Sequence, residues 1–213
     1  MGPGPSREDQ RQRVLSVASE VFAERGLDDV TMADIAEAAD VSRATVFNYF
    51  GSKYALVESI TETVLVIYRD MLDQALADET TPTADLVRRL FEDMGKGIES
   101  QRRFYRSVFR EITRIQLGLD EGSVAQRANE ETRTRLVLLV ARGQRRGDIS
   151  DDFDAETIAN AVASLSNGTI TGWLYHDDSS APLVNRMRDA AEVLLSPVER
   201  RPGRNPRTKG ESR

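Results

Sequence analysis

The chain has 213 residues, no cysteine, one histidine (His176) and a formal net charge of −6. That length can bury a sizeable core, either as one compact unit or as two small ones. The absence of cysteine excludes thiol chemistry and, with one histidine, leaves no set of zinc ligands, so neither a metal nor a cofactor is predicted. No secretory signal and no run of about 18 apolar residues occurs, which predicts a cytoplasmic protein without membrane contact. The acidic balance argues against a protein that coats nucleic acid indiscriminately, but it leaves room for a local DNA-binding face.

The apolar spacing predicts helices almost throughout and no strand, so the expected fold class is all-α with about nine helices. The first helix covers about 7–25, and Gly26 stands where a C-terminal cap belongs. Thr31 is the N-cap of a short second helix ending near Ala39, with Asp34 at the capping-box position.

Ser42 begins a third helix that ends near Tyr49, and Ser52 begins a long fourth helix that reaches about Ala77. Further helices are expected near 84–99, 102–117, 122–146, 155–175 and 182–195. The turn-rich segment 143–154 is expected to be a loop whose Asp154 caps the next helix. Residues 1–6 and the basic segment 197–213 are expected to be disordered tails.

Residues 31–50 have the layout of a helix-turn-helix, with two short helices joined at Asp40 and Val41. Small residues stand where the helices would cross, and the recognition helix can be anchored by Ile35, Val41, Val46 and Phe50. A packed helical corner without DNA binding would explain a bare pair of short helices equally well. If the anchors face inward, the third helix turns its polar side to DNA. The predicted contacts are Thr31, Ser42, Arg43, Ala44, Thr45, Phe47, Asn48, Tyr49 and Lys53.

Within this set, base contacts and phosphate contacts are expected to come from different residues. Arg43 could read guanine, Asn48 could read adenine, and Thr45 or Phe47 could meet a thymine methyl group. Donors near helix N-termini would hold phosphates: Thr31, Ser42, Tyr49 and Lys53.

At these residues the sequence resembles the TetR (tetracycline-repressor) family over about 45 residues. The matching positions are Ala18, Val21, Phe22, Gly26, Thr31, Ile35, Ala36, Ala39, Val41, Ser42, Phe47, Tyr49, Phe50, Ser52, Lys53 and Leu56. Asp40 departs from the usual glycine, although aspartate tolerates a left-handed conformation. Phe47 departs from a common tyrosine, which puts that residue's usual phosphate contact in doubt.

The resemblance implies a transcriptional repressor with a DNA-binding domain at 7–53 and an effector-binding and dimerisation domain at 54–196. It also implies an unidentified small effector, expected to be largely apolar, that favours the form with the DNA heads spread apart, with the fourth helix as lever. A homodimer would place two recognition helices on double-stranded DNA with a palindromic operator.

The helix expected near 155–175 is apolar around much of its circumference, so one side can pack against a second copy in a four-helix bundle. The predicted interface residues are Ile158, Val162, Leu165, Thr169, Val184, Met187, Ala191 and Leu194. A monomeric core explains the same stripes. Aromatic, flexible and isolated polar residues are the candidates for an effector pocket, although at helical spacing they can equally be core. They are Tyr68, Phe91, Met94, Phe104, Phe109, Leu138, Asn167, Thr171 and Trp173.

Two other function classes were weighed. An enzyme would have to use the carboxylates Asp148, Asp151, Asp152 and Asp154, but they lie in a polar connection without a phosphate loop, a nucleophile set or a cofactor fingerprint. Catalysis is therefore not expected. A helical protein-interaction module without DNA binding is the alternative reading. His176 is expected at an exposed helix end.

Overall fold

The computed structural model describes residues 6–116, 124–176 and 181–199. Within these ranges the chain forms helices and no strand, which confirms the all-α fold class. The helices are α1 (Arg7–Arg25), α2 (Met32–Ala38), α3 (Arg43–Phe50), α4 (Lys53–Ala77), α5 (Thr83–Ser100), α6 (Arg102–Gln116), α7 (Val124–Arg146), α8 (Ala155–Tyr175) and α9 (Leu183–Leu195).

Side chains cap the N-termini of several helices. Thr31, Ser42, Ser52 and Asp154 each accept a hydrogen bond from a backbone N–H in the first turn of the helix that follows, as predicted. These groups satisfy amides that have no partner inside the helix. Ser6 caps α1 in the same way, so the predicted N-terminal tail is one residue too long. Helices α5 and α9 follow prolines and have no side-chain cap.

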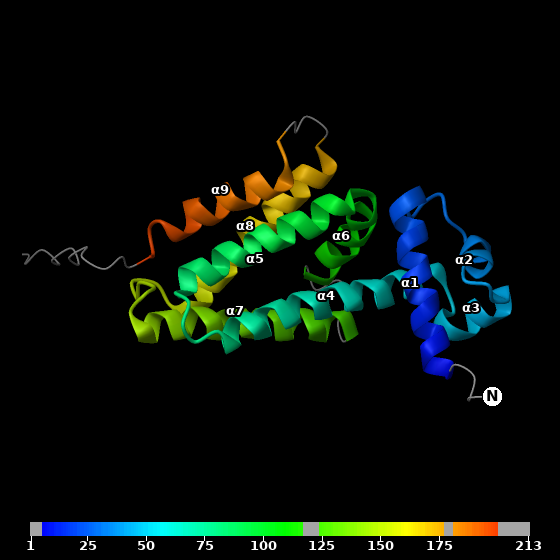
Figure 1. The fold of residues 1–213 in the computed structure, drawn as a ribbon, viewed down its shortest axis with the longest axis horizontal. Helices are drawn as coiled ribbons and strands as arrows, with labels where there is room; N and C mark the ends of the chain where they lie inside the picture. The colour runs from blue at the N-terminus through cyan, green and yellow to red at the C-terminus, as the bar shows by residue number, and fades with distance from the viewer. Residues whose placement is uncertain (1–5, 117–123, 177–180, 200–213) are drawn as a thin grey trace, which may run out of the picture.

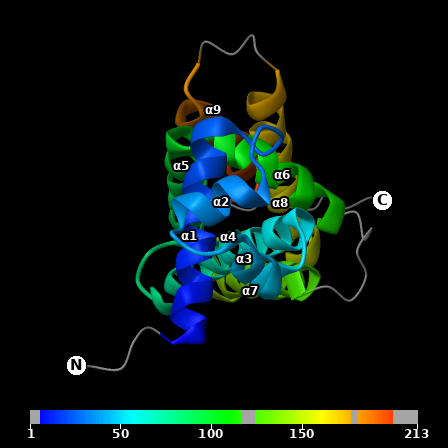
Figure 2. The same cartoon turned by 90° about the vertical axis from the view of Figure 1, so that its right-hand side faces the viewer.

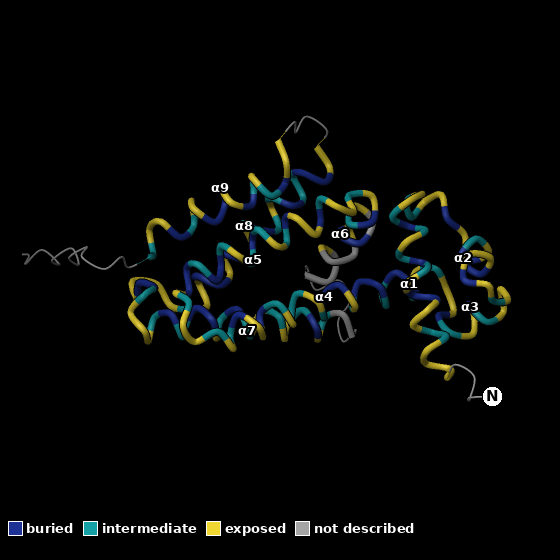
Figure 3. The backbone as a smooth tube through the Cα atoms, viewed as in Figure 1, coloured by how far each residue is buried: buried dark blue, intermediate teal, exposed yellow. Residues whose placement is uncertain are grey.

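The helices form two groups joined by α4 (Figure 1). Helices α1, α2 and α3 gather around the first turns of α4, and Figure 2 shows this end facing the viewer. The rest of α4 packs along α7, while α5 packs on α9 and α8 lies against both α7 and α9. The buried residues run through both groups without a break (Figure 3). No described helix is both long and apolar enough to cross a membrane.

Residues 197–199 are packed against the rest of the chain, which the sequence did not predict. The backbone N–H of Ser150 donates to the carbonyl of Val198 at 2.6 Å, and Ile149 pairs with Glu199 in an isolated β-bridge. Glu199 also accepts a hydrogen bond from Arg88 on α5 at 2.9 Å. The predicted disordered tail is therefore wrong for residues 197–199, and its remainder lies outside the described residues.

Candidate nucleic-acid interface and ligand cavity

The turn between α2 and α3 has the geometry that its sequence predicts. Asp40 adopts φ of 52°, the left-handed conformation in which glycine is most common. The backbone N–H of Val41 donates to the carbonyl of Ala36 at 3.0 Å, which closes the turn. Ala39 is fully buried, so α2 and α3 can approach closely at this point.

A capping box holds the start of α2. The carboxylate of Asp34 accepts hydrogen bonds from the hydroxyl and the backbone N–H of Thr31, and the Thr31 hydroxyl accepts from the Asp34 backbone N–H. Arg25, at the end of α1, lies 3.0 Å from the same carboxylate. The Thr31 hydrogen bonds, followed by Arg25, lower the pKa of Asp34 to about 2. The local sequence thus ties α2 to α1.

Helix α3 shows one face to the solvent. Val46 and Phe50 are buried, while Arg43, Ala44, Phe47 and Asn48 are exposed. Positions 43, 44, 47 and 48 share one side of a helix, so these residues form a continuous surface. The guanidinium group of Arg43 lies 5.4 Å from the centre of the Phe47 ring. This surface has the size and chemistry to enter a major groove.

Two predicted contact residues are turned toward other groups. Tyr49 is half-buried, and its hydroxyl donates to the side chain of Gln10 on α1 at 2.9 Å. Thr45 is half-buried, and its hydroxyl lies 2.8 Å from the hydroxyl of Ser42, within the cap of α3. The structure therefore assigns both residues a packing role. The sequence pattern missed this role because the partner of Tyr49 is 39 positions away.

The remaining predicted contacts lie around α3 at helix starts. Thr31 and Ser42 are exposed N-caps, and Lys53 is a half-buried residue in the first turn of α4. Arg7, which the sequence reasoning did not single out, lies beside them, with its guanidinium group 5.9 Å from the centre of the Tyr49 ring. On the same helix, Arg13 donates to the carbonyl of Ala39 at 2.8 Å and braces the turn.

A cavity of about 380 Å³ lies within the second helical group. Its lining is mostly apolar, with a set of small polar residues from α7 and α8. The lining residues are Leu65, Tyr68, Met71, Leu72, Val87, Leu90, Phe91, Met94, Phe109, Asn129, Thr132, Arg133, Leu136, Asn160, Val162, Ala163, Ser164, Ser166 and Asn167. The Arg133 side chain is paired with Glu156 at 2.8 Å, so its charge is already balanced. Such a cavity suits an apolar molecule with a hydrogen-bonding group.

The structure places some of the predicted pocket residues at this cavity and not others. Tyr68, Phe91, Met94, Phe109 and Asn167 line it. Phe104, Leu138, Thr171 and Trp173 do not line it. Phe104 is buried against Tyr105, Trp173 is buried beneath Arg102, Leu138 is half exposed to solvent, and Thr171 lies farther along α8.

The hydroxyl group of Tyr68 is buried and has no hydrogen bond in the described part of the chain. Its burial, followed by the nearby Tyr105 hydroxyl, raises the pKa of Tyr68 well above its usual value. A neutral hydroxyl group thus lies in the wall of the cavity, next to that of Tyr105.

The residues predicted for the dimer interface fall into a buried group and a partly exposed group. Ile158, Val162, Met187 and Ala191 are at most 6% exposed within the single chain, because α8 and α9 use these faces to pack on α5 and α7. These four side chains pack within one copy of the chain. Leu165, Thr169, Val184 and Leu194 are partly exposed, and their place in the interface stays a prediction.

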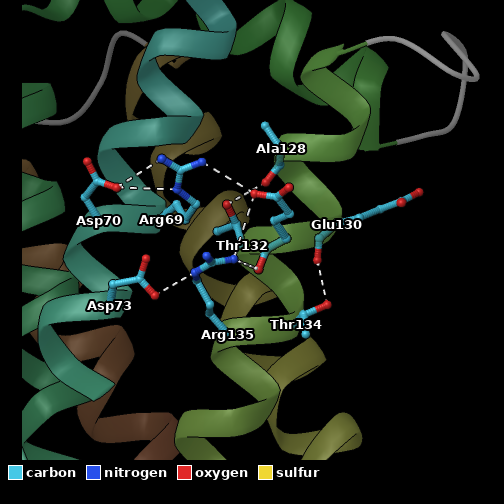
Figure 4. A network of polar contacts seen from close by, with 9 residues as sticks. Arg69, Asp70, Asp73, Ala128, Glu130, Thr132, Thr134 and Arg135 are labelled. Atoms are coloured by element: carbon cyan, nitrogen blue, oxygen red, sulfur yellow. Dashed lines mark hydrogen bonds and ion pairs between the residues drawn. The ribbon is translucent and has the colours of Figure 1, made fainter. Parts of the chain in front are cut away.

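Polar contacts fix the middle of α4 to α7 (Figure 4). Arg135 on α7 contacts Asp73 at 2.7 Å, and Glu131 on α7 contacts Arg69 at 3.5 Å. Near the C-terminal end of α4, the carbonyls of Leu76 and Ala75 accept hydrogen bonds from Arg142 of α7 at 2.7 and 3.0 Å. This half of α4 is therefore held to α7, whereas its first turns contact α1 and α3.

The acidic connection considered for catalysis is accounted for by structural contacts. Asp148 accepts a hydrogen bond from the backbone N–H of Thr83 at 2.9 Å, Asp152 accepts from the hydroxyl of Ser150, and Asp154 caps α8. Asp151 also has a polar contact. Across the described ranges, no group of three or more potential ligands is placed to hold a metal ion. His176 is exposed at the end of α8.

A short α2, a tight turn and an α3 with one solvent-facing side, all braced by α1, define a helix-turn-helix DNA-binding protein. Residues 14–60 match the family described as "Bacterial regulatory proteins, tetR family". The matched segment is a DNA-binding domain of this family, and the chain is a DNA-binding transcriptional regulator.

Similarity also extends beyond the matched segment. The transcriptional repressor BepR of Brucella suis is 24% identical over 88% of this chain and 91% of its own length. The putative mycofactocin biosynthesis regulator MftR of Mycobacterium tuberculosis is 28% identical over 92% and 95%. The fold resembles the crystal structure of Thermus thermophilus FadR, a TetR-family repressor in complex with lauroyl-CoA. The TM-score is 0.66, with 24% identity over 92% of this chain and 98% of that one.

Proposed function

We propose that this chain is a homodimeric repressor that binds a palindromic operator and leaves it when a small, largely apolar molecule enters the cavity. The carrying observation is that α4 belongs to both sites. Its first turns pack with the helix-turn-helix, and Leu65, Tyr68, Met71 and Leu72 of the same helix line the cavity.

In the proposed complex the exposed face of α3 lies in the major groove. Arg43 makes a bidentate contact to guanine, Asn48 pairs with an adenine edge, and Phe47 meets a thymine methyl group. Thr31, Ser42, Lys53 and Arg7 hold phosphates on either side. Tyr49 positions α1 against α3 through Gln10. The division into a DNA-binding part at 7–53 and an effector part at 54–196 is part of this proposal.

The proposed dimer uses the outward faces of α8 and α9. On α8, Ala161, Leu165, Gly168 and Gly172 recur at spacings of a helix face, and the Cβ positions of both glycines meet open space. Small residues let two helices approach closely. On α9, Val193 is 71% exposed and the neighbouring Leu194 is partly exposed, so this helix offers apolar atoms to a second copy.

Two routes connect the cavity to the DNA-binding helices. The middle of helix α4 is held to α7 (Figure 4), and its first turns pack with α1 and α3. Helix α6 provides Phe109 to the cavity, and its Arg103 donates to the carbonyl of Glu24 near the end of α1 at 2.7 Å. A ligand that fits one arrangement of these helices better than the other shifts the spacing of the two heads. The lauroyl-CoA complex of Thermus thermophilus FadR supports an apolar-chain ligand in this fold.

The test is selection of binding sites from random duplex DNA by the purified protein, with its mass measured by light scattering. We expect a dimer and an enriched palindrome whose half-sites lie about one helical turn apart. Addition of a ligand found to bind the cavity should lower operator affinity. A folded dimer that enriches no sequence at low salt would contradict DNA recognition and favour a protein-interaction module, and operator affinity indifferent to every bound ligand would contradict effector control.

A further inference from the structure

A second cavity, of about 260 Å³, lies between α4 and α5. Its lining residues are Met71, Gln74, Ala75, Asp78, Leu86, Arg89, Leu90 and Asp93. Met71 and Leu90 also line the first cavity. The two cavities are therefore neighbours that meet at Met71 and Leu90, and we call these two shared residues the partition.

This partition lies on a seam between two helix pairs. Helix α4 packs most extensively on α7, and α5 packs most extensively on α9, whereas α4 and α5 make little direct contact with each other. The two partition residues come from opposite sides of this seam. Both are partly exposed, unlike the tightly buried Leu72 and Phe91 beside them. Their side chains can therefore change rotamer without breaking a helix–helix interface.

The chemistry of the partition suits an aliphatic chain. Methionine has an unbranched and flexible side chain that adapts to irregular apolar space. Leu90 is apolar, and Ala75 and Leu86 continue the apolar surface into the second cavity. The second lining also includes three charged residues, but the side chains of Arg89 and Asp93 are 65% and 61% exposed to solvent, and Asp78 accepts hydrogen bonds from Thr81. A straight chain could pass there without desolvating an ion.

The two ends of the combined space differ. At the α7–α8 side of the first cavity, Asn129, Thr132, Asn160, Ser164 and Asn167 offer neutral hydrogen-bonding groups. Arg133 at this side is paired with Glu156. A polar head group is therefore expected between α7 and α8, with the chain directed toward the α4–α5 seam.

We propose, resting on the function proposed above, that the effector is a linear aliphatic chain with a polar head. The chain extends from the first cavity past Met71 and Leu90 into the second. These two side chains set the longest chain that the protein accepts. A compact, ring-shaped effector would fill the first cavity alone and would not depend on them.

The experiment measures the affinity of straight-chain primary alcohols, from about eight to about sixteen carbons, by displacement of N-phenyl-1-naphthylamine. Each methylene that enters apolar space should tighten binding about fourfold, until the chain meets a wall. In the double variant Met71→Ala/Leu90→Ala, affinity should keep rising with chain length beyond the limit of the unchanged protein. In Leu90→Phe, affinity should stop rising at a shorter chain length. Thermal melts verify that each variant is folded.

Met94→Ala is the matched control, because Met94 lines the first cavity but not the second. This variant should weaken all chains by a similar factor and leave the length limit unchanged. The inference is overturned if the double variant has the same chain-length limit as the unchanged protein, or if Met94→Ala moves that limit as far as the double variant does. It is also overturned if a cyclic alcohol binds as tightly as the straight-chain alcohol of equal carbon number, or if no alcohol binds. None of these outcomes bears on whether the protein recognises DNA, because the binding-site selection tests DNA recognition separately.

Discussion

The two ends of α4 lie in surroundings that are built differently. At its start, the helix-turn-helix is held by contacts that are mostly short in sequence: the box of Thr31 and Asp34, the cap of Ser42, and the left-handed Asp40. From its middle onward, α4 borders the cavity, which is lined by residues from five helices, α4 to α8. The shape of the helix-turn-helix depends on interactions between residues close in the sequence, whereas the shape of the cavity depends on how helices far apart in the sequence pack together.

This difference shows where each part can tolerate change. The exposed face of α3 has few partners inside the protein, so substitutions there should alter DNA recognition while stability changes little. Gly95, where α5 meets α9, cannot be substituted without a cost in stability, because its nearest neighbours include backbone atoms of Val184. The predictions below separate these two kinds of position.

The largest effect is expected from Arg43→Ala on the exposed face of α3. Loss of a bidentate base contact should weaken operator binding about tenfold to a hundredfold and relax selection at one base pair per half-site. Quantitative binding and a repeated site selection measure both effects. Lys53→Ala is the control, since loss of a phosphate contact should weaken all sequences alike and reduce the salt slope by about 1. An unchanged palindrome with Arg43→Ala would exclude a base-reading role.

The next effect is expected within α5, where two glycines have opposite surroundings. A Cβ at Gly95 would lie 2.9 Å from the Cα of Val184, whereas one at Gly97 would meet nothing within 4 Å. Gly95→Ala should therefore lower the free energy of unfolding by about 1 to 2 kcal/mol, because backbone atoms of α9 must move. Gly97→Ala should raise it by up to about 1 kcal/mol through helix propensity. Urea unfolding at matched concentrations tests the pair, and equal effects would contradict the close α5–α9 packing.

A smaller effect is expected from Tyr49→Phe. The variant loses the hydrogen bond to Gln10, which should cost about 0.5 to 1.5 kcal/mol of stability. A double-mutant cycle with Gln10→Ala measures the coupling between the two side chains. If Tyr49 instead donated to a phosphate, the variant would bind every DNA sequence more weakly by the loss of one hydrogen bond. We expect DNA affinity to stay the same when it is measured well below the unfolding temperature.

The smallest effect is a pH dependence at the α2 cap. The pKa of Asp34 is lowered from 3.8 to about 2 in the folded chain, so its stabilising contribution is present above about pH 4 and is lost as the pH falls through about 2. Asp34→Asn should lower the Tm at neutral pH, and the difference should disappear toward pH 2. Thermal melts across this range, with the exposed Asp28→Asn as control, measure it. A Tm difference that does not depend on pH would show that the charge of Asp34 is unimportant.

Helix positions were largely predictable, because their ends are marked by residues that act within one turn. The expected start of α4 at Ser52 and its end near Ala77 match the structure, as does the cap of α8 at Asp154. The same holds for the exposed side of α3, since buried Val46 and Phe50 leave Arg43 and Asn48 facing outward. Tyr49 and Thr45 escaped this reasoning because their partners depend on how α1 and the α3 cap are placed.

The cavity was only half predictable. Asn160 and Ser164 carry a signal that was overlooked, namely polar residues one turn apart on an otherwise apolar helix. Trp173 was chosen for its size, but its position beneath Arg102 follows from the angle between α6 and α8. No pattern in the sequence distinguishes Met71 or Leu90 from ordinary core residues.

The sequence by itself determined the all-α class, the helix ends and the DNA-facing side of α3, because caps, turns and helical periodicity act over a few residues. The tertiary structure alone decided which apolar faces of α8 and α9 turn inward, where the five helices leave space, and that Met71 and Leu90 meet across a seam. Those features depend on the packing of side chains far apart in the chain. Apolar spacing specifies that a face is buried, but it does not specify what the face is buried against.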